Sequence, residues 1–439
     1  MPVATPIASH SNGDNWILNL VPLGNHGLVS SFSDGSIKLY PLDKTPSRLF
    51  EPTHTIKAHN SSINSLRSID DQNLIGTAAA DSIKIFDLRT STNTPVFTFH
   101  NDRNIPFLSL DSNKNGLVAG GTELKQADSE LHIWDIRNSG TKIRSFVDSH
   151  HDDITEIKFH PTNESYLLSG STDGYVNIYD LNEKEEDDSL FQVINFDSIH
   201  SAGWLSNNRI YTLSHMETFA IHELNDKTDE LNEPKPLEFG DVRQNWDCEY
   251  IVDVYPGYIA MGSNSKSFAK IHSFQNEQID LQNSIQLNGA HGEEVIRDVY
   301  IKPNSNLIFT GGEDGCLKAW KNDFDINIPV NFIQSHANDG DVEMDIDENE
   351  HKDNEVDESS VSSDSEDEKK RKKKEKKKEK KEKKEKKEKK EKKEKKINIE
   401  DKTDKKDKKD KKDKKDKKDK KDRKAKKDKK EKDHRFKPY

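Results

Sequence analysis

The chain has 439 residues and a formal net charge of −12, but this charge is distributed very unevenly. Residues 1–338 carry 25 basic and 47 acidic side chains, residues 339–368 carry 1 and 15, and residues 369–439 carry 43 and 19. The last two segments contain almost no apolar residues, so they cannot bury enough surface to offset the entropy of an ordered chain. A folded domain is therefore expected only within residues 1–338, followed by an acidic disordered linker and a basic tail.

The two cysteines, Cys248 and Cys316, lie far apart in the sequence. This argues for a reducing compartment and against a disulfide framework. No apolar run approaches the roughly 20 residues that a membrane-spanning helix needs, and the start lacks the pattern of a signal peptide. We therefore expect an intracellular protein that does not enter a membrane.

The first element expected in chain order is a strand near Thr5–His10, because Ile7–His10 resembles the segment Ile56–His59 that precedes a later repeat. A ring of sheets has to be closed, since open terminal blades would expose unpaired strand edges. We predict that this N-terminal strand closes the ring as the outer strand of the last blade.

One pattern then recurs along the folded part of the chain. In Ser169–Asp180 a strand of small residues leads into a tight Asp-Gly turn and an alternating strand that ends in an aromatic residue. Copies are found at Ser31–Tyr40 and Thr310–Trp320, and degenerate copies at Thr77–Asp87 and Leu131–Asp135. Asp-Gly between alternating apolar runs is a strong hairpin signal, and repetition at about 40–45 residues is typical of β-propeller blades.

The repeat unit predicts an all-β, seven-bladed propeller, with six or eight blades as alternatives. The fifth and sixth repeats keep the alternation but lack the Asp-Gly turn. The seven segments are 16–43, 54–89, 96–137, 143–182, 191–225, 238–275 and 285–323.

These repeats resemble the WD-repeat superfamily over about 320 residues, and the resemblance implies a non-enzymatic propeller. A closer resemblance, to the WD repeat-containing protein 89 family, is carried by Val118–Glu123, Ile133–Arg137, His151–Pro161, Ser169–Asp180, Ala202–Trp204, Leu213–His215, Gly311–Gly315 and Trp320–Lys321. The tail from Lys369 onward departs from the animal members of that family.

In WD repeats, a histidine before the inner strand, a turn aspartate, a serine and an aromatic residue form a hydrogen-bonded network within a blade. Buried carboxylates need such donors. The alternative is a catalytic His-Asp pair, which is disfavoured because the pair recurs in several blades. The resemblance assigns the network to His59, His150, His291, Asp34, Asp173, Asp314, Ser171, Tyr179 and Trp320.

No sequence pattern supports an enzyme, a cofactor or a metal. Phosphate-loop and nucleophile-elbow motifs are absent from the sequence, and the cysteines have no near partner for zinc. The net charge of −22 on residues 1–338 favours basic protein partners, such as ribosomal proteins or histones. The alternative is that this charge only aids solubility. Thr122–Asp128 and Glu183–Asp188 are exposed candidate segments, but the sequence does not identify the binding loops.

The acidic linker and the tail carry candidate signals for phosphorylation and for nuclear import. Ser363 and Ser365 each have a glutamate three residues later, which suits an acidophilic kinase. A basic cluster of nuclear-import type follows; it comprises Lys369, Lys370, Arg371, Lys372, Lys373 and Lys374.

The remaining tail repeats Glu-Lys-Lys and then Asp-Lys-Lys. The Glu part favours a lone charged helix, because Glu and Lys recur four residues apart, whereas the Asp part favours coil. Such repeats resemble the tails of several fungal nucleolar ribonucleoprotein and rRNA-modification proteins. Dense lysine attracts phosphate without sequence preference, so weak RNA contact is one expectation and a solvated or intramolecularly paired tail is the other.

We therefore expect a monomeric scaffold that works within a complex in the nucleus or nucleolus, as an accessory factor in ribosome biogenesis. A histone- or chromatin-binding propeller is the main alternative. A cytoplasmic adaptor, such as a ubiquitin-ligase substrate receptor, is the third.

Overall fold

The structure is a computed structural model that describes residues 3–24, 26–42, 45, 48–90, 93–138, 140–226, 234–326 and 328–329. The chain separates into two compact units, Met1–Met344 and Asp345–Tyr439. The second unit lies outside the described residues, and so do the predictions made for residues 339–439.

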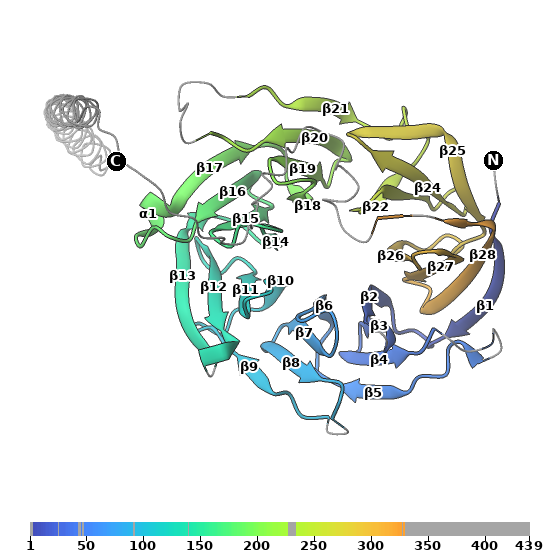
Figure 1. Cartoon of the computed structure of the whole chain (residues 1–439), viewed down its shortest axis with the longest axis horizontal. Coiled ribbons are helices and arrows are strands. Elements are labelled where there is room, and N and C mark those ends of the chain that lie inside the picture. Colours follow the sequence, from blue (N-terminus) through green and yellow to red (C-terminus); the bar gives the residue numbers. More distant parts are fainter. Residues whose placement is uncertain are drawn as a thin grey trace, which may run out of the picture. The chain divides into compact units, whose positions relative to one another are not determined.

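The described strands form seven four-stranded antiparallel sheets around a central channel (Figure 1). This confirms the seven-bladed propeller. We number the blades along the chain and give their strands from the channel outward. Blade 1 contains β2 (Ile17–Leu23), β3 (Gly27–Phe32), β4 (Ser36–Tyr40) and β5 (His54–Lys57); blade 2 contains β6 (Ile63–Ser68), β7 (Leu74–Ala79), β8 (Ile83–Asp87) and β9 (Phe97–Phe99); blade 3 contains β10 (Phe107–Ser112), β11 (Leu117–Thr122), β12 (Ser129–Asp135) and β13 (Thr141–His150).

The remaining blades follow the same order. Blade 4 contains β14 (Ile154–Phe159), β15 (Tyr166–Ser171), β16 (Tyr175–Asp180) and β17 (Leu190–Asn195); blade 5 contains β18 (Ile199–Trp204), β19 (Arg209–Ser214), β20 (Thr218–Glu223) and β21 (Leu237–Asp241); blade 6 contains β22 (Tyr250–Tyr255), β23 (Tyr258–Ser263), β24 (Phe268–Gln275) and β25 (Gln278–Asn288); blade 7 contains β26 (Ile296–Ile301), β27 (Ser305–Gly312), β28 (Cys316–Ile326) and β1 (Thr5–Ser11). Two short helical turns are η2 (Ile136–Asn138) and α1 (Glu186–Ser189).

The N-terminal strand closes the ring, as predicted. β1 pairs antiparallel with β28, from Thr5 opposite Lys321 to Ser11 opposite Cys316, and both strands lie at the same side of the ring (Figure 1). Most of the other sequence repeats also do not coincide with single blades. Each begins with the outer strand of one blade and continues into the three inner strands of the next.

The second strand of several blades ends in small residues because the next blade packs directly against it. A Cβ atom on Gly311 would lie 2.5 Å from Ile17 Cγ2, and one on Gly170 would lie 2.8 Å from Ile199 Cγ2. Ile17 and Ile199 are the first residues of the inner strands of the following blades, and both are fully buried. The pattern of small residues therefore sets how closely neighbouring blades approach.

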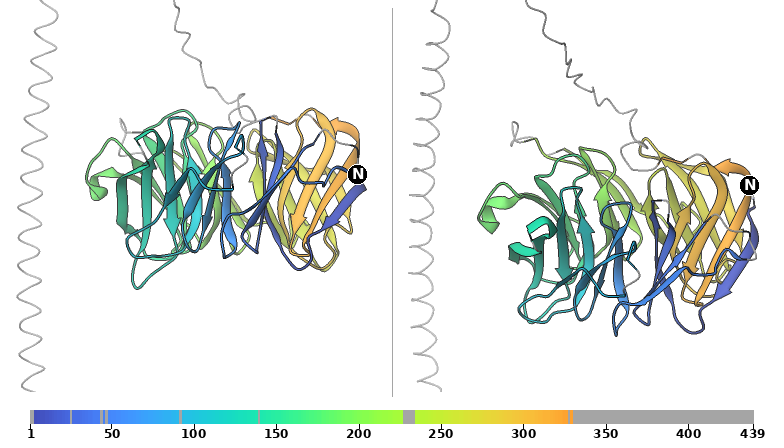
Figure 2. Two further views of the ribbon diagram at one scale, coloured as in Figure 1. Left: turned by 90° about the horizontal axis from the view of Figure 1, so that it is seen from below. Right: turned by 60° about the horizontal axis from the view of Figure 1, so that its bottom comes forward.

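The strands cross the thickness of the ring, so the loops gather on two opposite faces (Figure 2). We call the face formed by the loops that enter the inner strands, together with the loops between second and third strands, the upper face. The opposite face is the lower face. A groove of about 630 Å³ opens instead on the outer side, between Ile7–His10 of β1 and Phe50–Pro52.

We expect Gly311→Ala to lower the free energy of unfolding by about 1–3 kcal/mol, because the added methyl group collides with Ile17. Combining it with Ile17→Ala, which removes the Cγ2 methyl group that the new methyl group meets, should cost less than the sum of the two single changes. Urea unfolding of both single variants and the double variant measures this coupling. Strictly additive costs would contradict the packing described here.

Candidate functional site: the upper face and the central channel

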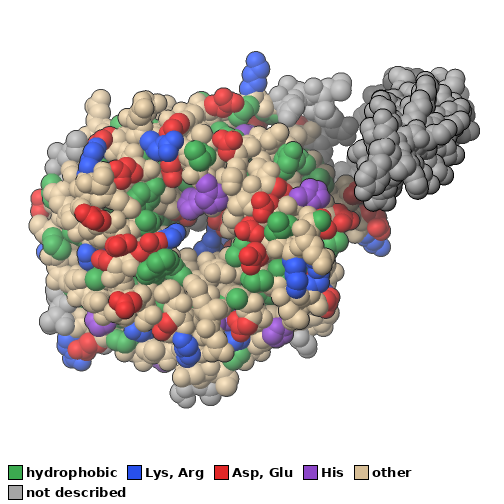
Figure 3. Space-filling view, turned by 180° about the vertical axis from the view of Figure 1, so that it is seen from behind, with side chains coloured by type: hydrophobic (Ala, Val, Ile, Leu, Met, Phe, Trp, Pro, Cys, Tyr) green, Lys and Arg blue, Asp and Glu red, His purple; other side chains and the backbone are tan. Residues whose placement is uncertain are grey.

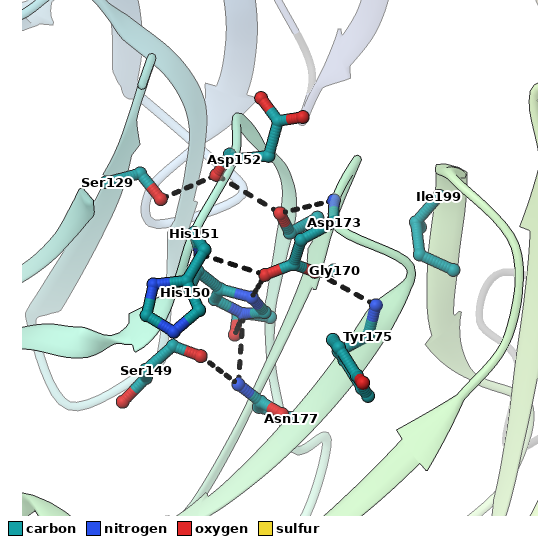
Figure 4. A network of polar contacts seen from close by, with 12 residues as sticks. Ser129, Ser149, His150, His151, Asp152, Gly170, Asp173, Tyr175, Asn177 and Ile199 are labelled. Carbon is teal, nitrogen blue, oxygen red and sulfur yellow. Dashed lines mark hydrogen bonds and ion pairs between the residues drawn. The ribbon is translucent and has the colours of Figure 1, made fainter. Parts of the chain in front are cut away.

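In blades 2, 4 and 7 a buried histidine joins the turn aspartate to a hydroxyl on the second strand. His150 Nδ1 lies 2.9 Å from Asp173 Oδ2, and its Nε2 lies 2.7 Å from Ser169 Oγ (Figure 4 shows the surrounding contacts). In blade 7, Trp320 Nε1–H donates to Thr310 Oγ1 at 3.0 Å, and Thr310 Oγ1 lies 2.8 Å from His291 Nε2. The ring of His291 then reaches Asp314 through Nδ1, at 2.6 Å.

The structure departs from the assigned residue set at three positions. The serine beside His150 is Ser169, whereas Ser171 accepts from the backbone N–H of Asp173 and donates to the carbonyl of Asp152. The reason is strand direction: successive residues point to opposite sides of the sheet, so Ser169 and Ser171 share a side but only Ser169 lies level with the histidine.

The carboxylates in the first two blades also differ from the assignment, at Asp34 and at Asp81. Asp34 accepts from the N–H and the hydroxyl of Ser36 and has Lys57 as its ionic neighbour, with no histidine bonded to it. His59 instead pairs at 2.5 Å with Asp81, in the degenerate copy that lacks the glycine.

In blades 2 and 7 the electrostatics of the pairs favour a neutral histidine and an ionised aspartate. Burial lowers the pKa of His59 and of His291, despite the partly compensating aspartates. Burial acts to raise the pKa of Asp314, but the hydrogen bond from His291 and the neighbouring donors outweigh it and set the pKa to about 2. Both ring nitrogens of each histidine are occupied within the blade, so these pairs hold the turn in place and leave no nitrogen for a substrate.

The inner strands line the channel in a shared register. Each of the seven carries a β-bulge near its start, after the first residue in six of them and after the second residue, Ile251, in β22. Counted from the residue at which the bulge begins, the third and fifth residues are equivalent from blade to blade. Neighbouring inner strands are tied through these positions: Asp111 Oδ2 accepts from the N–H of Phe159 at 2.7 Å, and Asp298 Oδ2 accepts from the N–H of Leu20 at 2.7 Å.

The third and fifth residues form two layers of different charge. The third positions, nearer the upper face, are Asn19, Ser65, Ser109, Glu156, Ser201, Asp253 and Asp298; the fifth positions are Val21, Arg67, Asp111, Lys158, Gly203, Tyr255 and Tyr300. The first layer thus has three carboxyl groups and no cation. The second has two cations and one carboxyl group.

Only Glu156 of the first layer has ion pairs among the described residues. Arg67 Nη2 lies 3.3 Å and Lys158 Nζ 3.1 Å from Glu156 Oε1. Asp253 accepts from Ser201 Oγ at 2.8 Å, and Asp298 from Tyr255 Oη at 2.6 Å. Burial is the main cause that raises the pKa of Asp253 and raises that of Asp298 to about 6.

The upper face carries exposed apolar side chains. Trp16 is 43% exposed and lies under the guanidinium of Arg297, while Met216 is 58% exposed in the turn of blade 5. Leu124 and Tyr175 are also exposed at this face. The other large exposed apolar residues of the described chain lie along the outer two strands of the blades or directly beside them.

Acidic residues dominate the loops of the upper face. All but two of its fourteen loops contain an aspartate or glutamate, whereas the basic residues in them are Arg103, Lys125, Arg243 and Lys266. Figure 3 shows one face of the ring with the channel open at its centre and acidic side chains spread over the surface. The segment Thr122–Asp128 belongs to the upper face, and Glu183–Asp188 to the lower face, where Glu186 accepts from the N–H groups of Val147 and Asp148.

The structure also bears on thiol chemistry and on metal binding. Cys248 and Cys316 are free thiols, and burial raises the pKa of Cys248 to about 12. Among the described residues, no group of three or more His, Cys, Asp or Glu side chains is arranged to hold a metal ion, and none of the helices has the length and apolarity to cross a membrane.

The channel residues were missed by the sequence analysis. Asp111, Glu156, Asp253 and Asp298 sit in strands whose apolar pattern looks ordinary. Their equivalent positions, the fifth for Asp111 and the third for the other three, appear only when the seven inner strands are aligned on their bulges. The bulge is what hides them, because it shifts by one residue which side chains face the channel.

The ring of four-stranded blades, with its histidine, aspartate and hydroxyl networks, defines a WD-repeat β-propeller, a fold that serves as a scaffold for protein interactions. The family described as "WD domain, G-beta repeat" matches residues 50–87, 140–180 and 282–321. An uncharacterized WD repeat-containing protein of Saccharomyces cerevisiae is 49% identical over 74% of this chain and 84% of its own length. The chain belongs to the WD-repeat protein family.

More distant relatives cover part of the ring. A WD repeat-containing protein 89 homolog of Dictyostelium discoideum is 28% identical over 45% of this chain and 52% of its own length, in agreement with the resemblance found in the sequence. The human nucleoporin Nup43 is 29% identical over 39% of this chain and 44% of its own length.

We expect Asp314→Asn to lower the free energy of unfolding at pH 7 by about 1–3 kcal/mol, because the hydrogen bond that His291 donates is then accepted by a neutral amide oxygen in place of a carboxylate. Asp34→Asn changes the same turn position in a blade without the histidine and should cost less. Urea unfolding of the two variants gives both values. Equal costs would show that the histidine contact adds nothing.

Asp298 gives the opposite pH dependence from Asp314. Because its pKa is raised, its protonated form stabilises the fold; this contribution is complete below about pH 4 and is lost as the pH rises through about 6. Asp298→Asn, which does not titrate, should therefore gain on the order of 2 kcal/mol relative to the native chain between pH 4.5 and 7.5.

Unfolding of both proteins at the two pH values checks this expectation, since groups that do not interact with Asp298 cancel in the difference. Asp34→Asn is the control: burial acts to raise the pKa of Asp34, but the hydrogen bonds from Ser36 outweigh it and lower that pKa. Among the described residues no histidine is hydrogen-bonded to Asp34, so the difference of this variant from the native chain stays nearly constant over this range. A constant difference for Asp298→Asn would contradict the assigned titration.

Proposed function

We propose that this protein is a non-enzymatic scaffold of the nucleus that binds basic proteins during ribosome assembly. The observation that carries the proposal is the acidic upper face, where all but two of fourteen loops contain a carboxylate around a channel whose first layer holds three more. Such a surface attracts basic proteins and speeds their encounter, and ribosomal proteins are basic.

The tail sequence supports the nuclear part of the proposal. The basic cluster Lys369–Lys374 has the composition of an import signal, and the lysine repeats that follow give it affinity for phosphate. A relative, Nup43, is by its name a nucleoporin. Phosphorylation at Ser363 or Ser365 would add negative charge to the acidic linker.

A histone- or chromatin-binding propeller is the second candidate. The same acidic face favours it, because histones are also basic and bind through charge. The two candidates differ in which assembly co-purifies with the protein.

The test is affinity purification of the tagged full-length chain and of a chain ending at residue 338, each with and without nuclease, followed by identification of bound proteins. We expect preribosomal proteins with both chains, resistant to nuclease, since the ring carries the contacts. Binding that disappears with nuclease would show that the tail only adheres to RNA. Histones in place of preribosomal proteins, or a cytoplasmic location of the intact chain, would overturn the proposal.

A further inference from the structure

Two carboxyl groups at the channel mouth have no cation within ion-pair distance among the described residues. Asp253 and Asp298 lie at the same level on neighbouring inner strands and are bonded to neutral donors, namely the hydroxyls of Ser201 and Tyr255 and backbone N–H groups. Within the described ranges of the chain, no lysine, arginine or histidine forms an ion pair with either one.

The cations nearest to these groups are already engaged. Arg67 and Lys158 both bind Glu156 from the layer below. Arg297, which precedes Asp298, is bonded to Glu313 and lies over Trp16. These cations act on Asp253 and Asp298 only at longer range. Neither carboxyl group therefore has an ion-pair partner of its own, although half-buried carboxylates are costly to leave ionised.

The face at which this mouth opens also carries exposed apolar side chains. Trp16, Leu124, Tyr175 and Met216 are exposed at the upper face, whereas no loop of the lower face within the described ranges exposes a large apolar residue away from the outer strands. Apolar side chains beside an acidic surface are suited to a protein segment, which offers both apolar and charged groups, more than to a free ion.

From these features we infer that the upper face binds an extended, Lys- or Arg-rich segment of a partner protein, one cationic side chain of which enters the channel mouth between Asp253 and Asp298. The inference deepens the scaffold function proposed above and rests on it. The cation forms ion pairs with Asp253 and Asp298, as Arg67 and Lys158 do with Glu156. Trp16 and Met216 contact the flanking residues of the segment. Charge complementarity selects this occupant, since an acidic segment would meet carboxylates in nearly every loop.

The test is fluorescence anisotropy of the full-length chain with labelled ten-residue peptides that contain four lysines or four arginines spaced by glycine and leucine. The matched peptides replace these residues with acetyl-lysine or citrulline, which have similar shapes and no charge. We expect the charged peptides to bind and the neutral ones to bind at least tenfold more weakly. Asp253→Asn and Asp298→Asn should each weaken binding of the charged peptides about tenfold, and Trp16→Ala several-fold.

Glu293→Gln is the control variant, because it removes one exposed carboxylate from the same face but outside the channel; it should weaken binding less than twofold. Thermal unfolding establishes that each variant is folded, and the amide variants keep the size of the native side chains. Equal weakening by Glu293→Gln and the two channel variants would show diffuse attraction only and would overturn the inference, as would the absence of binding.

The inference and the proposed function fail in different ways. If Asp253→Asn and Asp298→Asn leave peptide binding intact while the protein still co-purifies with preribosomal proteins, the channel site is wrong and the scaffold function stands. If the peptides bind as expected but the protein co-purifies with histones, the channel site stands and the ribosomal assignment is wrong.

Discussion

The contact between a small residue on a second strand and the first residue of the next inner strand is the constraint on which the ring depends. Gly311 against Ile17, Gly170 against Ile199 and Gly121 against Ile154 repeat it around the channel. Interiors pack at near-crystalline density, so this contact leaves little freedom in the distance between blades. Because Gly311 and Ile17 come from opposite ends of the domain, the same contact that spaces the blades also joins the two ends of the ring.

The channel follows from that spacing. Once the inner strands are held at fixed distances, a bulge at the same place in each one aims equivalent side chains at the axis, and Asp298 and Asp111 can bond to the backbone of the neighbouring blade. The charges are therefore arranged by the fold in layers, with carboxyl groups nearer the upper face and the cations Arg67 and Lys158 below. An axial gradient of charge gives the ring a polarity that its repeated architecture alone would not have.

The seven-bladed ring could be predicted from the sequence, but the charged residues that line the channel could not. Asp-Gly turns at Asp173 and Asp314 predicted the hairpins, and the likeness between two N-terminal segments predicted the closing strand, because both rest on local chemistry. In blades 5 and 6 the turn is made by Glu217 and Ser267 with positive φ, a conformation uncommon outside glycine, so no turn signal marks it. The channel carboxylates depend on a register that the bulges shift, and no single segment of sequence displays that register.

The hydrogen-bonded networks within the blades were likewise only partly predictable from the sequence. The pairing of His150 with Asp173 could be expected from the repeats, but the identity of its hydroxyl partner, Ser169, depends on which side of the strand faces the histidine. His59 finds its carboxylate in Asp81, where the usual glycine is replaced by Ser82. Side-chain partners across strands are thus set by geometry that a motif does not contain.

Closure by β1 also imposes an order on how the protein can be made. Thr5–Ser11 leaves the ribosome well before its partner β28, which begins at Cys316, some three hundred residues later. At roughly 5–20 residues per second, this strand waits on the order of 15–60 s without its neighbour. An unpaired strand invites pairing with other chains, and in Thr5–Ser11 the threonine, the two serines and the histidine keep it polar enough to remain in water until the last blade arrives.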